Sequence, residues 1–182
     1  MRLVLTDRDG VLNEDRAEGV RRPEELALIP GAAAAVRRLN RAGIPVAVVT
    51  NQSAVGRGLI GALELDAIHR RLETALAEAA GARIDLILTA PDAPEGAGPR
   101  RKPAPGMLLE AMARFGVAAE DAVMIGDDQR DLEAAAAAGC RRILVRTGKG
   151  AAFAAAGLPA WLQPVDLCDN FAAAVDRLLG PG

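Results

Sequence analysis

Short apolar runs alternate along this chain with longer segments rich in alanine, leucine, glutamate and arginine, and this alternation limits its possible folds more than any other feature. The apolar runs predict strands at Leu3–Leu5, Ile44–Val49, Ile84–Leu88, Ala122–Ile125 and Arg142–Val145. The longer segments predict helices, each followed by a glycine typical of helix ends, over Pro30–Ala42, Leu63–Ala80, Pro105–Phe115 and Gln129–Ala138. Strands that alternate with helices predict a parallel sheet covered on both faces, the doubly wound, Rossmann-like α/β class.

The rest of the chain fits the same organisation. After the turn at Gly148–Gly150 we expect a short helix, a last strand near Trp161 and a closing helix near Phe171–Leu179. No linker or internal repeat divides the 182 residues, so we expect a single domain over residues 1–182. The intervals after the first two strands are too short to hold a large inserted cap domain.

The charge balance limits the classes of partner. Lysine and arginine number 22 against 24 aspartates and glutamates, which gives a net charge of −2. Because binding to a nucleic-acid backbone needs clustered positive charge, we expect no nucleic-acid partner. No run approaches the roughly 18 apolar residues that a membrane helix needs, so we expect no membrane association.

The few cysteines and histidines limit the chemistry. Cys140 and Cys168 are too few for a disulfide framework or a multi-cysteine metal site. His69, the only histidine, argues against a histidine nucleophile that works with a second histidine. No signal peptide is evident, so we expect a cytoplasmic protein, and we expect it to be a monomer.

Two carboxylates directly follow the first predicted strand, at Asp7 and Asp9. In parallel α/β sheets, ligands bind just outside the carboxyl ends of the strands. A carboxylate at Asp7 can attack phosphorus and form an aspartyl-phosphate, while Asp9 can protonate the leaving oxygen and later take a proton from water. The alternative is a pair of turn aspartates without chemistry, since aspartate favours turns.

A polar segment directly follows the second predicted strand. It supplies hydroxyl, amide and free backbone N–H groups from Thr50, Asn51, Gln52 and Ser53. Such groups can hold the oxygens of a phosphoryl group. The alternative is a polar turn that begins a helix, with Thr50 or Ser53 as its cap.

A basic pair and an acidic cluster follow later strands. Lys102, beside Arg101, is a compact charge suited to a phosphoryl oxygen, unless the pair is merely exposed. Asp127, Asp128 and Asp131 would face Asp7 across the strand ends, where two like charges 4 Å apart repel by about 4 kcal/mol at an effective dielectric of 20. A bound cation relieves this repulsion, and oxygen ligands beside a phosphate suit Mg²⁺. For Asp128 and Asp131 an acidic helix N-terminus is the alternative.

Together these residues resemble the four motifs of the haloacid dehalogenase superfamily, in the order Asp7-x-Asp9-Gly10-Val11, Thr50-Asn51, Lys102-Pro103 and Gly126-Asp127-x3-Asp131. Longer stretches resemble one branch, the heptose-1,7-bisphosphate and histidinol-phosphate phosphatases, over Asp7–Asn13, Val49–Ser53, Arg101–Met107 and Val145–Lys149. The resemblance covers about residues 3–150 and implies a phosphatase of this superfamily without a large cap.

The resemblance also implies residue roles. Asp7 would be the nucleophile and a Mg²⁺ ligand, and Asp9 the acid/base that offers its backbone carbonyl to the metal. Asp127 would be the second carboxylate ligand. The phosphoryl and substrate contacts would come from Thr50, Asn51, Gln52, Ser53, Arg101, Lys102 and Asp128.

Two segments depart from the branch. Its members usually carry a structural zinc loop of three cysteines and a histidine, but Ala90, Asp92, Gly98 and Arg100 stand at the corresponding positions. We therefore expect no zinc. Residues 18–20 also lack the aromatic side chain often found there.

The implied activity is Mg²⁺-dependent hydrolysis of a small phosphomonoester through an aspartyl-phosphate. D-glycero-D-manno-heptose 1,7-bisphosphate is the leading substrate, and histidinol phosphate is the alternative. A non-catalytic, receiver-like phospho-acceptor is a rival from another class, but Asp9 would shorten the lifetime of its phospho-aspartate. A nucleic-acid 3′-phosphatase is a second rival, and it predicts a basic groove.

Overall fold

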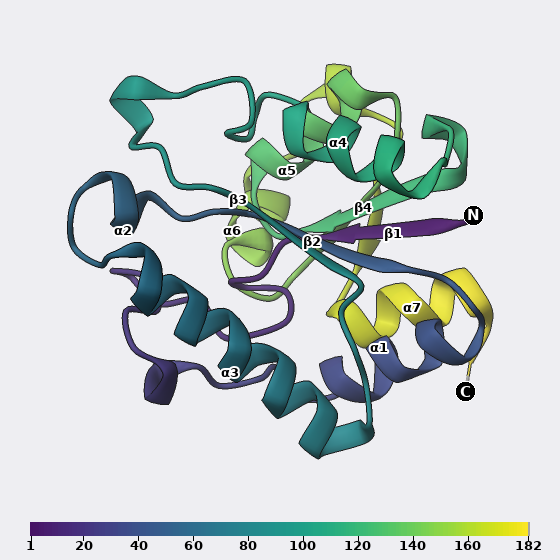
Figure 1. Ribbon diagram of the computed structural model, residues 1–182. Coiled ribbons are helices and arrows are strands. Elements are labelled where there is room, and N and C mark those ends of the chain that lie inside the picture. The colour runs from purple at the N-terminus through teal and green to yellow at the C-terminus, as the bar shows by residue number, and fades with distance from the viewer. Residues whose placement is uncertain (182) are drawn as a thin grey trace.

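The computed structural model describes residues 1–181 and shows a parallel six-stranded sheet between two layers of helices (Figure 1). The strands are β1 (Leu3–Thr6), β2 (Val46–Asn51), β3 (Leu86–Ala90), β4 (Ala122–Gly126), β5 (Arg141–Val145) and β6 (Asp166–Cys168). They lie in the order β3-β2-β1-β4-β5-β6, and every pairing is parallel. The predicted doubly wound α/β class is confirmed.

The α-helices are α1 (Ala32–Arg41), α2 (Ser53–Gly56), α3 (Ala62–Ala80), α4 (Gly106–Phe115), α5 (Gln129–Ala138), α6 (Gly150–Ala156) and α7 (Phe171–Leu179). In Figure 1, α4 and α5 cover one face of the sheet, and α1, α3 and α7 cover the other. The two faces follow the alternation along β1, because Val4 packs toward α1 and α7 while Leu3 and Leu5 pack toward α4 and α5.

The end of the chain differs from the prediction. The last strand is Asp166–Cys168, not a segment near Trp161, which lies in a single 3₁₀ turn at Ala160–Leu162. Trp161 is 62% exposed, so its apolar ring does not mark a buried strand. The strand that does form is a short edge strand that pairs with β5. The second and third strands are also shifted by two residues, to Val46–Asn51 and Leu86–Ala90 from the predicted Ile44–Val49 and Ile84–Leu88.

The strand order creates the place for a site. The chain leaves β1 toward β2 and β3, and later adds β4, β5 and β6 on the other side. Thr6 pairs with Val48 on one side and with Ile125 on the other, so the residues after three strands meet at one edge. Ligands bind at such a switch in strand order. Within residues 1–181, no helix combines the length and the apolar character needed to cross a membrane.

Candidate active site

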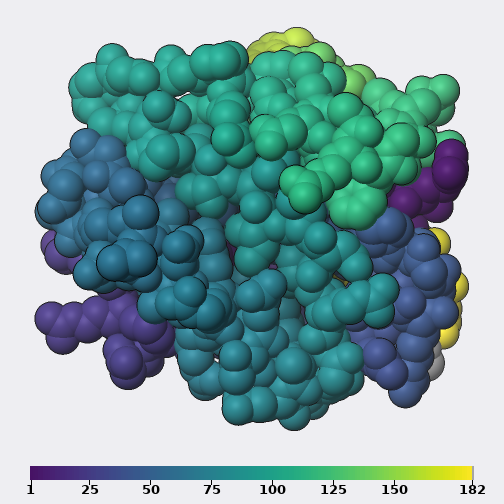
Figure 2. Space-filling model, in the orientation of Figure 1, coloured from purple at the N-terminus to yellow at the C-terminus, as the bar shows by residue number. Residues whose placement is uncertain are grey.

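A cavity of about 330 Å³ opens at the carboxyl edge of the sheet. The segments that follow β1, β2 and β3 gather around this end of the molecule, at the left of Figure 2. All ten residues proposed from the sequence line the cavity: Asp7, Asp9, Thr50, Asn51, Gln52, Ser53, Arg101, Lys102, Asp127 and Asp128. The structure thus brings the predicted residues together, and their roles remain predictions.

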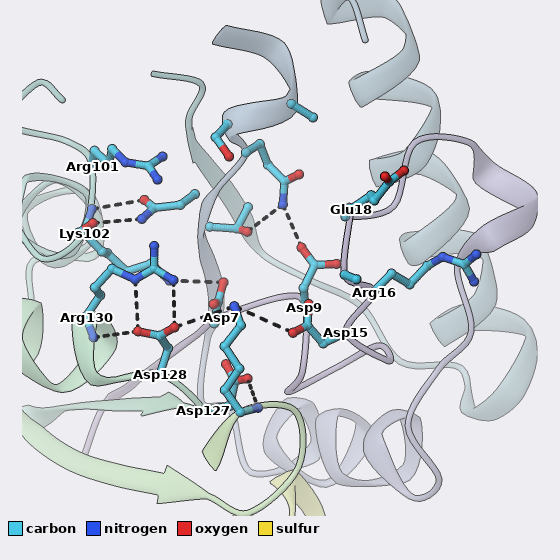
Figure 3. Close-up of a pocket in the computed structure, with 18 of the residues that line it drawn as sticks. Asp7, Asp9, Asp15, Arg16, Glu18, Arg101, Lys102, Asp127, Asp128 and Arg130 are labelled. Carbon is cyan, nitrogen blue, oxygen red and sulfur yellow. Dashed lines mark hydrogen bonds and ion pairs between the residues drawn. The ribbon is translucent and has the colours of Figure 1, made fainter. Parts of the chain in front are cut away.

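Asp7 occupies the centre of the site, with Lys102 and Asp128 on one side and Asp9 on the other (Figure 3). Its backbone N–H continues the sheet by donating to Ile125 O at 3.0 Å. Asp7 Oδ1 accepts the Arg8 backbone N–H at 2.7 Å and lies 3.1 Å from Lys102 Nζ. Asp7 Oδ2 has no hydrogen-bond donor within residues 1–181, which leaves it the oxygen available to attack.

Gly10 makes the turn after Asp9 possible. Its φ of +80° lies in the left-handed region that favours glycine, and a Cβ there would run into the carboxylate of Asp127. The turn thus allows the first and fourth motifs to approach one another. Thr147 Oγ1 closes it from the other side by donating to Gly10 O at 2.6 Å.

Four hydrogen bonds fix the carboxylate of Asp9. Arg8 Nη2 donates to Oδ1 at 3.1 Å and to Oδ2 at 2.9 Å. Asn13 Nδ2 donates to Oδ1 at 2.9 Å, and Gln52 Nε2 donates to Oδ2 at 2.8 Å. Burial alone would raise the pKa of Asp9, but the Arg8 charge and these amide donors outweigh it, so the pKa lies below its usual value.

Thr50 and Asn51 end β2, Gln52 directly follows it, and all three make hydrogen bonds within the site. Gln52 Nε2 bridges Asp9 and Thr50 Oγ1, the latter at 2.9 Å. Asn51 directs both ends of its amide to the backbone of Lys102, accepting its N–H at 3.0 Å and donating to its carbonyl at 2.9 Å. Asn51 therefore positions the lysine segment in this structure.

Lys102 is 2% exposed and joins two carboxylates. Its Nζ lies 2.6 Å from Asp131 Oδ1 as well as 3.1 Å from Asp7 Oδ1. Burial alone would lower the pKa of Lys102, but Asp131 and Asp7 reverse this effect and raise it, so the side chain is a cation at neutral pH. Asp131, whose role the sequence leaves open, thus holds the lysine.

Asp7, Asp127 and Asp131 bring one carboxylate oxygen each within 4.8 Å of one another. Burial raises the pKa of Asp127 to about 8, and the charges of Asp7 and Asp131 add to this rise. Burial also raises the pKa of Asp7 to about 6, against the opposing effect of Lys102. Lys102 pairs with Asp7 and Asp131, two of these three carboxylates, and the cluster fits a divalent cation with a preference for oxygen ligands, such as Mg²⁺.

Asp128 is a helix cap. Its Oδ1 accepts the Arg130 backbone N–H at 3.0 Å at the start of α5, and its two oxygens pair with the Arg130 guanidinium at 3.0 and 2.7 Å. Although burial opposes it, this pairing lowers the pKa of Asp128 below its usual value. The same pairing holds the Arg130 guanidinium at the cavity, which both residues line, and the substrate contact of Asp128 stays a prediction.

Several cations that line the cavity had no role predicted from the sequence: Arg16, Arg21, Arg57, Arg130 and Lys149. Some are neutralised locally, since Arg21 lies 3.0 Å from Glu18, and Lys149 Nζ lies between Asp15 and Asp128 at 3.7 and 3.6 Å. Their long side chains converge only through the fold, so spacing in the sequence does not reveal them.

The loop at residues 90–100 offers no cysteine or histidine, and its side chains do not suit a structural zinc ion. Direct contacts hold its ends. Gly56 donates to Pro91 O at 2.9 Å, and a Cβ at Gly56 would collide with the backbone of this loop. Arg101 Nη1 donates to Asp92 O at 2.7 Å.

The fold, the carboxylate pair and the buried lysine define a hydrolase that acts on phosphate esters. A family model described as HAD-hydrolase-like matches residues 99–174. The D-glycero-β-D-manno-heptose-1,7-bisphosphate 7-phosphatase of Bordetella bronchiseptica is 39% identical over 98% of each chain. The D-glycero-D-manno-heptose-1,7-bisphosphate 7-phosphatase of Thermosynechococcus vestitus is 40% identical, over 95% of this chain and 93% of that protein.

Solved structures agree. A D,D-heptose 1,7-bisphosphate phosphatase from B. bronchiseptica, complexed with magnesium and phosphate, covers 98% of each chain with a TM-score of 0.92 and 39% identity. The D,D-heptose 1,7-bisphosphate phosphatase from Burkholderia thailandensis covers 100% of each chain with a TM-score of 0.75 and 36% identity. The chain therefore belongs to the haloacid dehalogenase-like hydrolases, and it is a phosphoric monoester hydrolase.

Proposed function

We propose that this protein is a Mg²⁺-dependent phosphatase that acts on D-glycero-D-manno-heptose 1,7-bisphosphate through an aspartyl-phosphate. The observation that carries the proposal is Asp7, which has one oxygen held by Arg8 N and Lys102 Nζ and the other free, beside the firmly held acid/base Asp9. The similarity to heptose bisphosphate phosphatases over 98% of the chain supports the substrate.

In the first step, Asp7 Oδ2 attacks phosphorus and the bond from phosphorus to the ester oxygen breaks. Asp9 gives its proton to the leaving oxygen, and Lys102 offsets charge beside the attacked group. In the second step, Asp9 takes a proton from water while the water oxygen attacks phosphorus. This step releases inorganic phosphate and restores the carboxylate of Asp7.

We expect Asp7 and Asp127 to hold Mg²⁺ through their carboxylates and Asp9 to hold it through its backbone carbonyl. When bound, the ion neutralises phosphoryl charge and relieves the repulsion among the buried carboxylates. Asp9 must carry a proton before it can act as an acid, but its lowered pKa leaves it ionised in the free protein. A phosphate dianion bound beside it raises its pKa, because a nearby negative charge favours the protonated form.

The cations of the cavity favour a bisphosphate over histidinol phosphate. Arg101 lies near Arg57 and Arg130, and its guanidinium has no carboxylate partner in the part of the chain that the structure describes. A second phosphate group suits this cluster. Histidinol phosphate has no second phosphate group for this cluster, and the same arginines would repel the ammonium group on the carbon next to its phosphorylated carbon.

The test is phosphate release across a panel of sugar phosphates and histidinol phosphate, with Mg²⁺ and with a chelator. We expect the heptose bisphosphate to give the highest kcat/KM, and we expect the chelator to abolish turnover. The Asp7→Asn protein serves as the control. Turnover by this variant, or a phosphorylated protein that never hydrolyses, would contradict the proposal, and the second result would support the receiver-like rival.

A further inference from the structure

Arg8, between the two motif aspartates, has no part in the chemistry proposed above, yet it is the largest of the fully buried side chains. Its exposed fraction is 0%, and its only carboxylate partner within residues 1–181 is Asp9, at 2.9 Å. Arg8 Nε and Nη1 have no hydrogen-bond partner in the described chain. A buried charge of this kind needs an explanation.

Stabilisation of the fold does not explain a buried arginine at position 8. A guanidinium has five N–H donors, and here only the two on Nη2 are used. Taking a charge out of water is unfavourable, and well-packed apolar side chains commonly replace buried ion pairs without loss of stability. An apolar side chain of similar length would fill the same space, so packing alone does not account for an arginine at this position.

The geometry of the contact is more informative. Arg8 Nη2 donates to both oxygens of Asp9, at 3.1 and 2.9 Å, and so bridges the carboxylate. Asn13 and Gln52 supply one further donor to each oxygen. Without Arg8 each oxygen would keep a single amide donor, and the carboxylate could rotate between them.

The backbone of Arg8 ties this contact to the nucleophile. Its N–H donates to Asp7 Oδ1 at 2.7 Å, and its carbonyl accepts the N–H groups of Leu12 and Asn13 at 2.9 and 3.1 Å. The same residue therefore orients Asp7 through its main chain and Asp9 through its side chain. Nearby His69 on α3 is neutral, because burial and the Arg8 charge lower its pKa to about 4, and its Nε2 makes no hydrogen bond to the guanidinium within residues 1–181.

We propose that Arg8 is a positioning residue that fixes the Asp9 carboxylate in the orientation needed for proton transfer to the leaving oxygen. This inference rests on the proposed aspartyl-phosphate mechanism. It predicts that loss of Arg8 slows phosphoenzyme formation more for a leaving group that needs a proton than for one that does not.

The test compares two leaving groups in single-turnover phosphorylation of the protein. A sugar alkoxide needs a proton as it leaves, whereas p-nitrophenolate does not. We expect Arg8→Met to slow phosphoenzyme formation from the sugar phosphate about 100-fold, in the range of general acid catalysis, and to slow the reaction of p-nitrophenyl phosphate less than about threefold. Arg8→Lys keeps the charge and one directed donor, and it should restore part of the sugar phosphate rate.

Matched variants separate the possible results. Asp9→Asn should show the same dependence on leaving group, and adding Arg8→Met to it should bring little further loss if Arg8 acts through Asp9. Thr50→Val, which alters a contact shared by both substrates, should slow both equally. An equal loss on both substrates in Arg8→Met, or no loss on either, would overturn the positioning role.

Two outcomes would contradict the proposed function itself and not the role of Arg8. If the unaltered protein forms no phosphoenzyme, the mechanism fails, and if Asp9→Asn shows no dependence on leaving group, the acid assignment fails. Thermal unfolding of each variant shows whether it is folded. If Arg8→Met does not fold, Arg8→Lys and Arg8→Gln carry the same comparison, and equal losses on both substrates in these variants refute the role.

Discussion

Replacing Asp127 by asparagine should make the metal-free protein more stable, although it removes a group proposed for metal binding. Asp127 is 2% exposed, and burial together with Asp7 and Asp131 raises its pKa from 3.8 to about 8. At pH 7 the carboxyl is ionised in the unfolded chain but protonated in the folded one. Folding at pH 7 therefore requires the Asp127 carboxylate to take up a proton, which costs free energy because this group is ionised in the unfolded chain.

The size of the effect follows from the two pKa values. At pH 7 the penalty is about 1.4 kcal/mol for each of the roughly three pH units above 3.8, or about 4 kcal/mol, and at pH 5 it is about 2 kcal/mol. Between pH 4 and 8 the folded state binds the extra proton, so the stability of the metal-free protein falls as pH rises. Asparagine has no such penalty, and its oxygen can still accept the Lys149 N–H that now donates to Asp127 at 2.8 Å.

Thermal unfolding in a chelator at pH 5 and pH 7 measures this effect. We expect Asp127→Asn to raise the free energy of unfolding by about 2–4 kcal/mol at pH 7, which for 182 residues raises Tm by roughly 5–15 °C. The gain should be smaller at pH 5. With excess Mg²⁺ the natural protein should gain stability by binding the ion, and the variant should gain little.

The neighbouring aspartate provides the matched control. Asp128 caps α5 and pairs with Arg130, so its pKa is lowered and Asp128→Asn should destabilise the protein in the same chelator. A metal-free Asp127→Asn protein that is no more stable than the natural one at pH 7 would refute the reasoning, because the carboxylate would then carry no burial penalty.

Three further predictions concern the same site. Asp7→Asn should abolish phosphate release while its circular dichroism spectrum stays unchanged, and measurable turnover would contradict the nucleophile assignment. Gly10→Ala should destabilise the protein by at least about 1 kcal/mol and weaken Mg²⁺ binding, since φ is +80° and the new methyl group meets Asp127; urea unfolding and metal titration measure both. Mg²⁺ binding at pH 7 should release about one proton, because Asp127 is protonated before the ion binds; identical binding heats in two buffers of different ionisation enthalpy would contradict this.

The sheet and the position of the site could be predicted because strand ends carry strong local signals. β1 is an apolar run followed at once by Asp7 and Asp9, and β4 is followed at once by Asp127. β6 gives no such signal, since its residues Asp-Leu-Cys are too few and too mixed to show alternation, and only its pairing with β5 defines it. Short edge strands depend on their neighbours, not on their own sequence.

Contacts between distant side chains could not be predicted. Asp131 lies 2.6 Å from Lys102, which is 29 positions away in the chain, and this contact depends on how α5 packs on the sheet. Asn51 has the amide of a phosphate-binding residue, but the backbone of Lys102 uses both ends of it. Residue type indicates which bonds a side chain can make, whereas the fold decides which ones it makes.

The paired hydrogen bonds between Asn51 and Lys102 have a consequence for how this family can diversify. Gly56 fixes one end of the intervening loop at Pro91, and Asn51 fixes the other at Lys102, at 2.9–3.0 Å. The lysine is thus anchored independently of the length and sequence of the residues between these two points. Most of that segment can be exchanged between relatives, or redesigned for a new substrate, while the ammonium beside Asp7 keeps its place.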